Sequence, residues 1–377
     1  MPLFYPTLYV SVHMRARSLA LNTIQNALNA IKALYAWQSY YNIDYELRFV
    51  RGLLLQSHEI HSLRDFMQRP LSSESNEKII SISRPKSVSA ANQYSRLSVI
   101  AEYLGFLAIQ LHPPTAESGT KIAAMVAQIK ANRPIISSKS NSDRDEKHLD
   151  DLVLDALEMA LQPGSSNNPA HDHSIQIRNA LIFTLLRSTG LRRGELLNLK
   201  VEDINFSNNT LRVVRRPDTK GDSRVYQPVA KTRERTFPLM PELIEKIHEY
   251  VIKHRKKIPH AKKHGYIFVT HKTGKSQGEP LSNAWFGKFM GELKIIVEGA
   301  SLIHAHSLRH HWNYSFSRMC EKQSFSPERE EKIRSYLMGW SETSGTASTY
   351  NRRHVKEQAR EAVLELQTKN LKHLLCK

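Results

Sequence analysis

Side chains in the second half of the chain have the chemistry needed to cleave a phosphodiester. Arg192, His306, Arg309, Trp340 and Tyr350 occur in this order. A tyrosine hydroxyl can displace a phosphodiester oxygen only if strong, permanently charged donors hold the phosphoryl oxygens while negative charge develops on them. Two separated arginines and a hydroxyl nucleophile meet that requirement, and the chemistry they predict needs no metal ion.

The charge balance favours a polyanionic partner. The 377 residues include 54 Lys+Arg and 36 Asp+Glu, which gives a formal net charge of +18. Nucleic acid is the leading candidate, and a basic face on anionic lipid is the alternative. The sequence contains no run of about 18 apolar residues, and its first residues lack the basic start and cleavage site of a signal peptide. We therefore expect a cytoplasmic, nucleoid-associated protein with no membrane partner.

Length and composition predict two domains joined by a linker. A single core tends to split beyond roughly 250 to 300 residues. Residues 134–149 combine Pro, Ser, Asn and mixed charge with no apolar period, as a linker does. We predict a helical N-terminal domain over 1–133 and a catalytic domain over 150–377. Cys320 and Cys376 are too few for a disulfide framework and lack the spacing of a zinc site, and we expect no cofactor.

Apolar periodicity predicts helices in the first third of the chain. Steps of three and four relate the residues of two stripes, namely Leu21, Ile24, Leu28, Ile31 and Leu34, and Leu97, Ile100, Leu104, Leu107 and Leu111. Asn22 and Gln25 have capping-box spacing at the start of the first stripe. Pro113 and Pro114 should end the second helix.

Between residues 150 and 240 the pattern changes from helix to sheet. Residues 152–161 and 175–186 predict helices, and Gly190 should end the second of them before another apolar segment at 195–199. Alternation and turn residues over 210–239 predict a small antiparallel sheet of hairpins. The expected fold class is mainly α, with this sheet in the C-terminal domain.

Four motifs carry a family resemblance. Residues 190–196, Gly-Leu-Arg-Arg-Gly-Glu-Leu, resemble the first arginine box of the tyrosine recombinase (phage integrase) family, and residues 306–310, His-Ser-Leu-Arg-His, match its HxLRH box. Leu337 to Trp340, followed by Tyr350, is similar to the LGH segment and the nucleophilic tyrosine. The order and the intervening sheet agree over residues of about 150 to 355, and the helical first third fits the core-binding domain in position and size.

The resemblance implies a site-specific DNA recombinase or integrase. Tyr350 would attack the scissile phosphate to give a 3′-phosphotyrosyl link, and strand exchange would pass through a Holliday junction without metal or ATP. Arg192 and Arg309 would hold the non-bridging oxygens, and His306 would bind the phosphate or accept the tyrosine proton. The implied partners are double-stranded DNA, three further protomers in a synaptic homo-tetramer, and in some systems an accessory DNA-bending or directionality factor.

Two positions differ from the usual pattern or have a competitor. Trp340 stands where most members carry a second histidine, and its indole N–H can donate to a phosphate oxygen but cannot shuttle a proton. The general acid is predicted to be Lys231, which lies in a stretch resembling the family pattern KTxxRxxPL. Lys220, at the turn of an apparently extra hairpin, is the competing candidate.

Plainer interpretations remain open for several residues. Arg192 could be a surface ion-pair partner, Arg193 is the less favoured arginine of the box, and Glu195 is more plausibly structural. The histidines at 304–311 could suggest a metal site, but no carboxylate or cysteine at ligand spacing accompanies them. The basic cluster at 253–263 could be a solvated face or a DNA-backbone contact.

Two alternative functions remain open, the first sharing the predicted fold and the second sharing the predicted chemistry. One is a catalytically silent DNA-binding regulator, and the other is an enzyme of the type IB topoisomerase kind that works on a single duplex. The tail carries an apolar stripe of Val355, Ala359, Val363 and Leu366. That stripe could pack on its own domain or, by the resemblance, dock on a neighbouring protomer.

Overall fold

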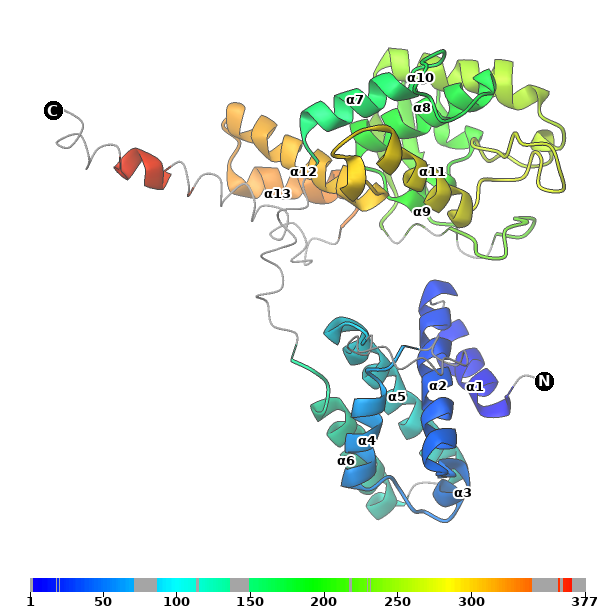
Figure 1. Ribbon diagram of the computed structural model, residues 1–377, viewed down its shortest axis with the longest axis vertical. Coiled ribbons are helices and arrows are strands. Elements are labelled where there is room, and N and C mark those ends of the chain that lie inside the picture. The colour runs from blue at the N-terminus through cyan, green and yellow to red at the C-terminus, as the bar shows by residue number, and fades with distance from the viewer. Residues whose placement is uncertain are drawn as a thin grey trace, which may run out of the picture. The chain divides into compact units, whose positions relative to one another are not determined.

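The protein forms two compact units, residues 1–141 and 142–377 (Figure 1). The computed structural model describes residues 3–17, 19, 21–70, 87–112, 115–135, 149–216, 219–228, 230, 232–340, 359 and 362–367. The division between the units falls inside the segment 134–149. No helix in the described ranges is both long enough and apolar enough to cross a lipid bilayer.

Every regular element of the N-terminal unit is a helix in its described residues. Its elements are α1 (Phe4–Tyr9), the π-helix η1 (Val10–Arg15), α2 (Leu21–Tyr41), α3 (Tyr45–Val50), α4 (Ser57–Phe66), α5 (Ala90–Leu111) and α6 (Ala116–Ala131). Helix α2 buries Ile24, Ile31 and Leu34, as predicted, but Leu28 is 40% exposed. Asn22 lies inside α2, which begins at Leu21, so the predicted capping box at Asn22 is wrong.

Helix α5 is the core helix of this unit and confirms the second predicted stripe. It contacts α2, α3 and α6, and Leu97, Leu104 and Leu107 are fully buried. A Cβ on Gly105 would lie 2.8 Å from a methyl carbon of Val126, so the glycine permits close packing of α5 on α6. Pro113 and Pro114 lie outside the described residues.

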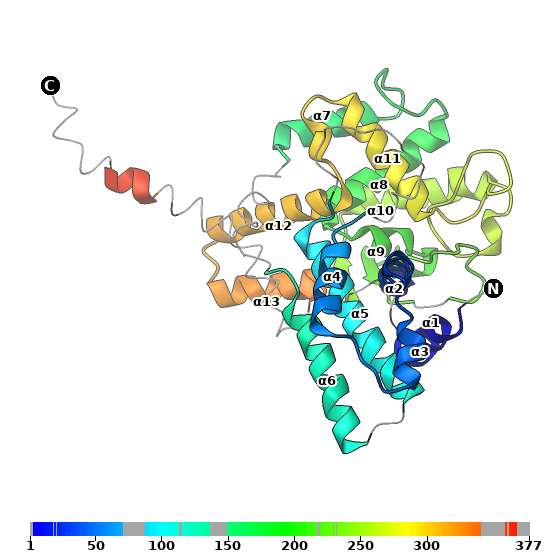
Figure 2. The same ribbon diagram turned by 60° about the horizontal axis from the view of Figure 1, so that its bottom comes forward.

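The C-terminal unit is mainly helical (Figure 2) and contains a small three-stranded sheet. Its elements are α7 (Asp151–Leu161), α8 (His173–Thr189), α9 (Arg193–Leu197), η3 (Val201–Asp203), β1 (Ile204–Asn205), β2 (Thr210–Val213), β3 (Arg235–Pro238), α10 (Pro241–Glu249), η4 (Tyr250–His254), η5 (Arg255–Lys257), η6 (Ala261–Lys263), α11 (Asn283–Ile296), η7 (Ala300–Leu302), α12 (Ala305–Lys322) and α13 (Pro327–Met338). The predicted helices at 152–161 and 175–186 are confirmed as α7 and α8. Helix α8 packs on both α7 and α12.

The antiparallel sheet is confirmed but is smaller than predicted. Its strand order is β1-β2-β3, with Leu211 opposite Phe237. Among the described residues between β2 and β3 there is no strand, so the predicted extra hairpin carrying Lys220 is wrong. Instead the buried Arg224 anchors this segment: its Nη1 donates to the carbonyls of Leu197, at 2.8 Å, and Leu281, at 3.1 Å.

Candidate active site

Arg192 lies at a sharp corner between α8 and α9. Helix α8 ends at Thr189, and Gly190 adopts the left-handed conformation with φ 62°. A Cβ at Gly190 would lie 3.1 Å from the Trp312 ring, so glycine satisfies both the backbone and the packing. The chain then turns Arg192 inward, half-buried, and leaves Arg193 exposed. Of the two adjacent arginines, only Arg192 is thus directed toward the interior.

Glu195 is the hydrogen-bond acceptor that holds this corner together. It is buried and accepts hydrogen bonds from Arg235 Nη2 at 2.9 Å and Thr232 Oγ1 at 2.5 Å. Its Oε2 also accepts from the backbone N–H of Arg192 at 3.0 Å. Burial acts to raise the pKa of Glu195, but the charge and hydrogen bonds of Arg235 outweigh it and hold that pKa at about 2. Glu195 therefore serves as a permanently charged structural partner.

Arg309 enters the corner from the first turns of α12. Its side chain is 0% exposed. Nη1 donates to the Gly190 carbonyl at 2.8 Å, and Nη2 donates to the Met338 carbonyl at 2.9 Å. The two carbonyls fix the plane of the guanidinium. Because the side chain is fully buried, a ligand can reach it only if groups at the surface of the corner move.

The C-terminal end of α13 closes the corner. The Met338 carbonyl accepts from both Arg309 and Arg192, whose Nη1 lies 3.4 Å away. Arg235 Nε donates to the preceding carbonyl, of Leu337, at 2.6 Å. Gly339 then turns the chain with φ 65° and accepts from the backbone N–H of Arg233 at 3.1 Å. We call Arg192, Arg235, Arg309 and these carbonyls the arginine corner.

Trp340 follows the arginine corner in sequence, and its side chain is largely buried. It is 7% exposed, and its ring lies 5.5 Å from the Arg309 guanidinium carbon. This is cation–π range, so Trp340 contacts one of the predicted phosphate-binding groups. The turn after α13 therefore places Trp340 against Arg309, and the Met338 carbonyl at the end of α13 contacts Arg192.

His306 lies at the exposed side of the corner, one helical turn before Arg309. Its ring is edge-on to that of His310, with centroids 4.3 Å apart. Desolvation by the surrounding protein, then the charges of His304, Arg309 and Arg192, lower the pKa of His306. The neutral imidazole is thus favoured at neutral pH, which is the form that can accept a proton. His304 is committed elsewhere, because its Nδ1 caps α12 by accepting from the Ser307 N–H at 2.8 Å.

Two predicted site residues, Lys231 and Tyr350, lie outside the described residues. The neighbour of Lys231 in sequence, Thr232, is bonded to Glu195 and therefore belongs to the corner. Lys220, the competing lysine, is exposed in the segment between β2 and β3. In the described ranges no three His, Cys, Asp or Glu side chains are arranged so that they could hold a metal ion, and this includes the histidines at 304–311.

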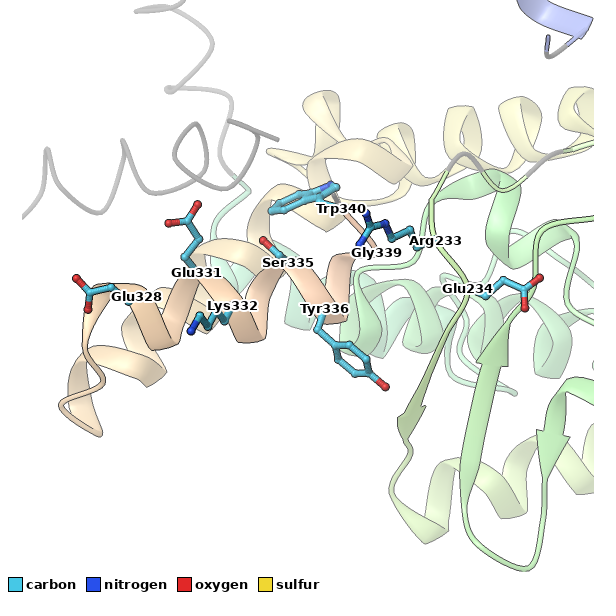
Figure 3. Close-up of a pocket in the computed structure, with 9 residues that line it drawn as sticks. All are labelled: Arg233, Glu234, Glu328, Glu331, Lys332, Ser335, Tyr336, Gly339 and Trp340. Carbon is cyan, nitrogen blue, oxygen red and sulfur yellow. The ribbon is translucent and has the colours of Figure 1, made fainter. Parts of the chain in front are cut away.

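A cavity of about 640 Å³ borders the corner on the face of α13 (Figure 3). Its lining mixes acidic and basic side chains, including Glu328, Glu331, Lys332 and Arg233, and reaches Trp340. A phosphate-binding cradle requires an excess of positive charge, so the mixed cavity lies beside the candidate phosphate site and does not form it.

No role was predicted for Arg235 or Thr232 from the sequence. Both lie in the stretch that resembles KTxxRxxPL. Glu195, the only carboxylate of the first arginine box, was the sequence feature that could have pointed to these partners. A glutamate within an apolar segment requires a cationic partner if it is buried.

Comparison with known proteins establishes the family. Residues 165–357 match the model of the phage integrase family, which is more than half of the chain. The chain therefore belongs to the phage integrase family, as its motifs predicted. It is 27% identical over 202 residues to the tyrosine recombinase XerD of Halalkalibacterium halodurans, covering 51% of this chain and 60% of the relative.

One further curated relative and one solved structure are also similar to this chain. The chain is 30% identical to the tyrosine recombinase XerC of Staphylococcus aureus (strain USA300), covering 37% of this chain and 40% of the relative. These alignments span about half the length of the curated relatives. A solved structure of the XerH site-specific recombinase bound to a palindromic difH substrate aligns over 95% of this chain and 93% of that chain, with 14% identity and a TM-score of 0.45.

Proposed function

We propose that this protein is a site-specific DNA recombinase or integrase that cuts and rejoins double-stranded DNA without metal or ATP. The observation that carries the proposal is that Arg192 and Arg309 converge on one oxygen atom, the Met338 carbonyl. That oxygen stands in for a non-bridging phosphate oxygen, because it accepts from two guanidinium groups as such an oxygen would.

The other groups complete a phosphoryl-transfer site. His306, favoured in its neutral form, would accept the tyrosine proton or bind a phosphate oxygen. Tyr350 would be the nucleophile, Lys231 the general acid at the 5′ oxygen, and Trp340 an indole donor. Because Arg309 is buried, DNA binding would have to shift the turn after α13 before this arginine contacts a phosphate.

We infer that the N-terminal unit, residues 1–133, is the core-binding domain and that residues 150–377 form the catalytic domain around duplex DNA. The protein would act in the cytoplasm, where nucleoid DNA lies. Strand exchange would require a homo-tetramer on two duplexes and, in some reactions, an accessory factor.

The exposure of apolar tail residues supports the proposed assembly between protomers. Val363 and Leu366, two members of the predicted apolar stripe, are 50% and 58% exposed. Val355 lies outside the described residues. Exposed apolar side chains of the described tail residues would be available for a neighbouring protomer.

A suicide-substrate assay tests the proposed function. Such a duplex carries a nick next to the candidate cleavage position, so the short 5′-hydroxyl strand diffuses away and the covalent complex accumulates. Covalent complex that converts to exchanged product when a second duplex is added supports a recombinase. Rejoining confined to one duplex would indicate a relaxing enzyme, and binding without any covalent complex would indicate a DNA-binding regulator.

A further inference from the structure

The loops after α10 carry a concentration of positive charge that the arginine corner does not use. Residues 250–278 contain no Asp or Glu, and they include eight basic side chains: Lys253, Arg255, Lys256, Lys257, Lys262, Lys263, Lys272 and Lys275. Solvated basic faces usually include carboxylates that balance the charge. A segment of this length without one requires an explanation beyond solubility.

The one arginine and the seven lysines of this segment differ in burial. Arg255 is buried, while every lysine of the segment is exposed. Arg255 donates through Nε to the Tyr266 carbonyl at 2.8 Å and through Nη2 to the carbonyls of Ala261 and His264, both at 2.7 Å. The arginine thus fixes the backbone on which the lysines project outward.

Within this segment, the loop 271–278 contacts the loop 259–264. His264 Nε2 lies 2.8 Å from the Gly278 carbonyl oxygen. Gly278, with φ 79°, approaches so closely that a Cβ there would lie 1.9 Å from the Pro259 carbonyl oxygen. Tyr250 Oη and His271 Nε2 are 3.1 Å apart in the interior. The two loops therefore lie against each other at these contacts.

Most of these lysines are not neutralised by the protein. Lys253 pairs with Glu249 at 3.0 Å. Among the described residues, the other six form no ion pair with a carboxylate, and we call them the lysine surface: Lys256, Lys257, Lys262, Lys263, Lys272 and Lys275. Crowded like charges repel one another and destabilise the folded protein, so an external polyanion would relieve the repulsion.

We propose that the lysine surface is a second DNA-binding site, which holds the phosphate backbone of duplex DNA outside the catalytic site and independently of base sequence. In both views helix α13 lies at one side of the C-terminal unit and the yellow-green loops lie at the other (Figures 1 and 2). The inference rests on the proposed function in taking DNA as the polyanion.

The chemistry of the surface favours duplex DNA over lipid. Lysine ammonium groups act as point charges that meet phosphates without reading bases. Helices that bind membrane interfaces also present large apolar side chains for insertion. Residues 250–278 are all described, and Ile252 is the single large hydrophobic side chain exposed among them. Charge without an apolar face fits a backbone contact.

The test compares two fourfold variants of the full chain. The first carries Lys256→Gln, Lys257→Gln, Lys262→Gln and Lys263→Gln. The matched control carries Lys246→Gln, Lys288→Gln, Lys294→Gln and Lys322→Gln, which are also exposed lysines of the same unit, and of which Lys288 pairs with Glu292 at 3.8 Å. Both variants carry four fewer positive charges than the wild type, so a difference between them reports position and not net charge. Thermal melting confirms that each variant folds.

Binding to a random-sequence duplex of about 60 base pairs is measured by fluorescence anisotropy over a salt series. The first variant should bind about tenfold or more weakly, and the slope of log K against log[salt] should become shallower by about 0.9 for each phosphate that the protein no longer neutralises. The control should stay close to wild type. Equal reductions in affinity for both variants, or wild-type affinity for the first, would overturn the proposal.

A second probe decides the class of partner. Binding to vesicles of phosphatidylcholine and phosphatidylserine is measured for the same proteins. Loss of vesicle binding with unchanged duplex binding would assign the surface to a membrane and overturn the proposal. The covalent-complex assay separates the lysine surface from the catalytic proposal. If the first variant binds the duplex like wild type, and both proteins form covalent complex, only the lysine-surface proposal is refuted. A wild type that binds the duplex but forms no covalent complex refutes only the catalytic proposal.

Discussion

The arginine corner and the lysine surface use positive charge in opposite ways. In the corner, Arg235 and Arg309 are buried and their donors are directed at Glu195 and at backbone carbonyls. On the surface, lysines are exposed and only their backbone is fixed, by Arg255. A planar guanidinium with fixed acceptors defines positions to within a hydrogen bond, whereas mobile ammonium groups supply attraction without geometry.

This contrast leads to an expectation about substitutions. Changes in the corner should alter rate or stability even when charge is conserved. Changes on the lysine surface should alter affinity and its salt dependence in proportion to the charge removed. The following variants test that difference, beginning with the largest expected effect.

The general acid should produce the largest effect. Loss of a general acid costs on the order of a hundred- to ten-thousandfold in rate. Lys231→Ala should show such a loss on ordinary DNA and recover on a 5′-bridging phosphorothiolate, whose sulfur leaves without needing a proton. Lys220→Ala should cleave both substrates at nearly the wild-type rate. Single-turnover cleavage measures both, and rescue confined to the Lys220 variant would transfer the role to that lysine.

Conservative changes in the arginine pair come next. Arg192→Lys and Arg309→Lys should each slow cleavage by on the order of a hundredfold or more, because one ammonium cannot satisfy two acceptors in fixed directions. Arg193→Lys is the matched control, since Arg193 is exposed. Rates under saturating protein separate cleavage from binding. Greater sensitivity at Arg193 would show that the register of the first arginine box is wrong.

Much of this architecture was predictable from the sequence. Helices α2, α5, α7 and α8 followed from their apolar periods, and Gly190 marked a helix end. The extent of the sheet was not predictable, because contacts of Arg224 with distant carbonyls hold its segment in place of a strand ladder. The meeting of Arg192 and Arg309 at the Met338 carbonyl also depends on tertiary packing that no local pattern encodes.

Glu195→Gln should destabilise the corner by about 3 to 5 kcal/mol, because it leaves the buried Arg235 without its counter-charge. The effect should depend on pH. The pKa of Glu195 is lowered from 4.5 to about 2, so its contribution is present above pH 4.5 and is lost as pH falls toward 2. Denaturant unfolding at a series of pH values measures this. A wild type and a variant that lose stability in parallel over that window would contradict the account.

The turn at Gly339 should give the smallest effect of the set. Gly339→Ala should cost about 1 to 3 kcal/mol, because left-handed backbone is combined with crowding. The added Cβ would lie 2.8 Å from Thr232 Cβ. Gly221→Ala is the control, since Gly221 has φ 85° but open space around it, and it should cost less. Equal melting temperatures for the two variants would show that the corner tolerates the added carbon.

The central claim is that this site forms a covalent link to DNA through Tyr350, and trapping that link tests it most directly. Wild-type protein and Tyr350→Phe are incubated with a nicked suicide duplex in EDTA, and covalent complexes are resolved on a denaturing gel. The account predicts a 3′-phosphotyrosyl complex for the wild type, none for Tyr350→Phe, and nearly equal DNA binding for both. A covalent complex formed by Tyr350→Phe, or wild-type cleavage that requires a divalent metal ion, would contradict it.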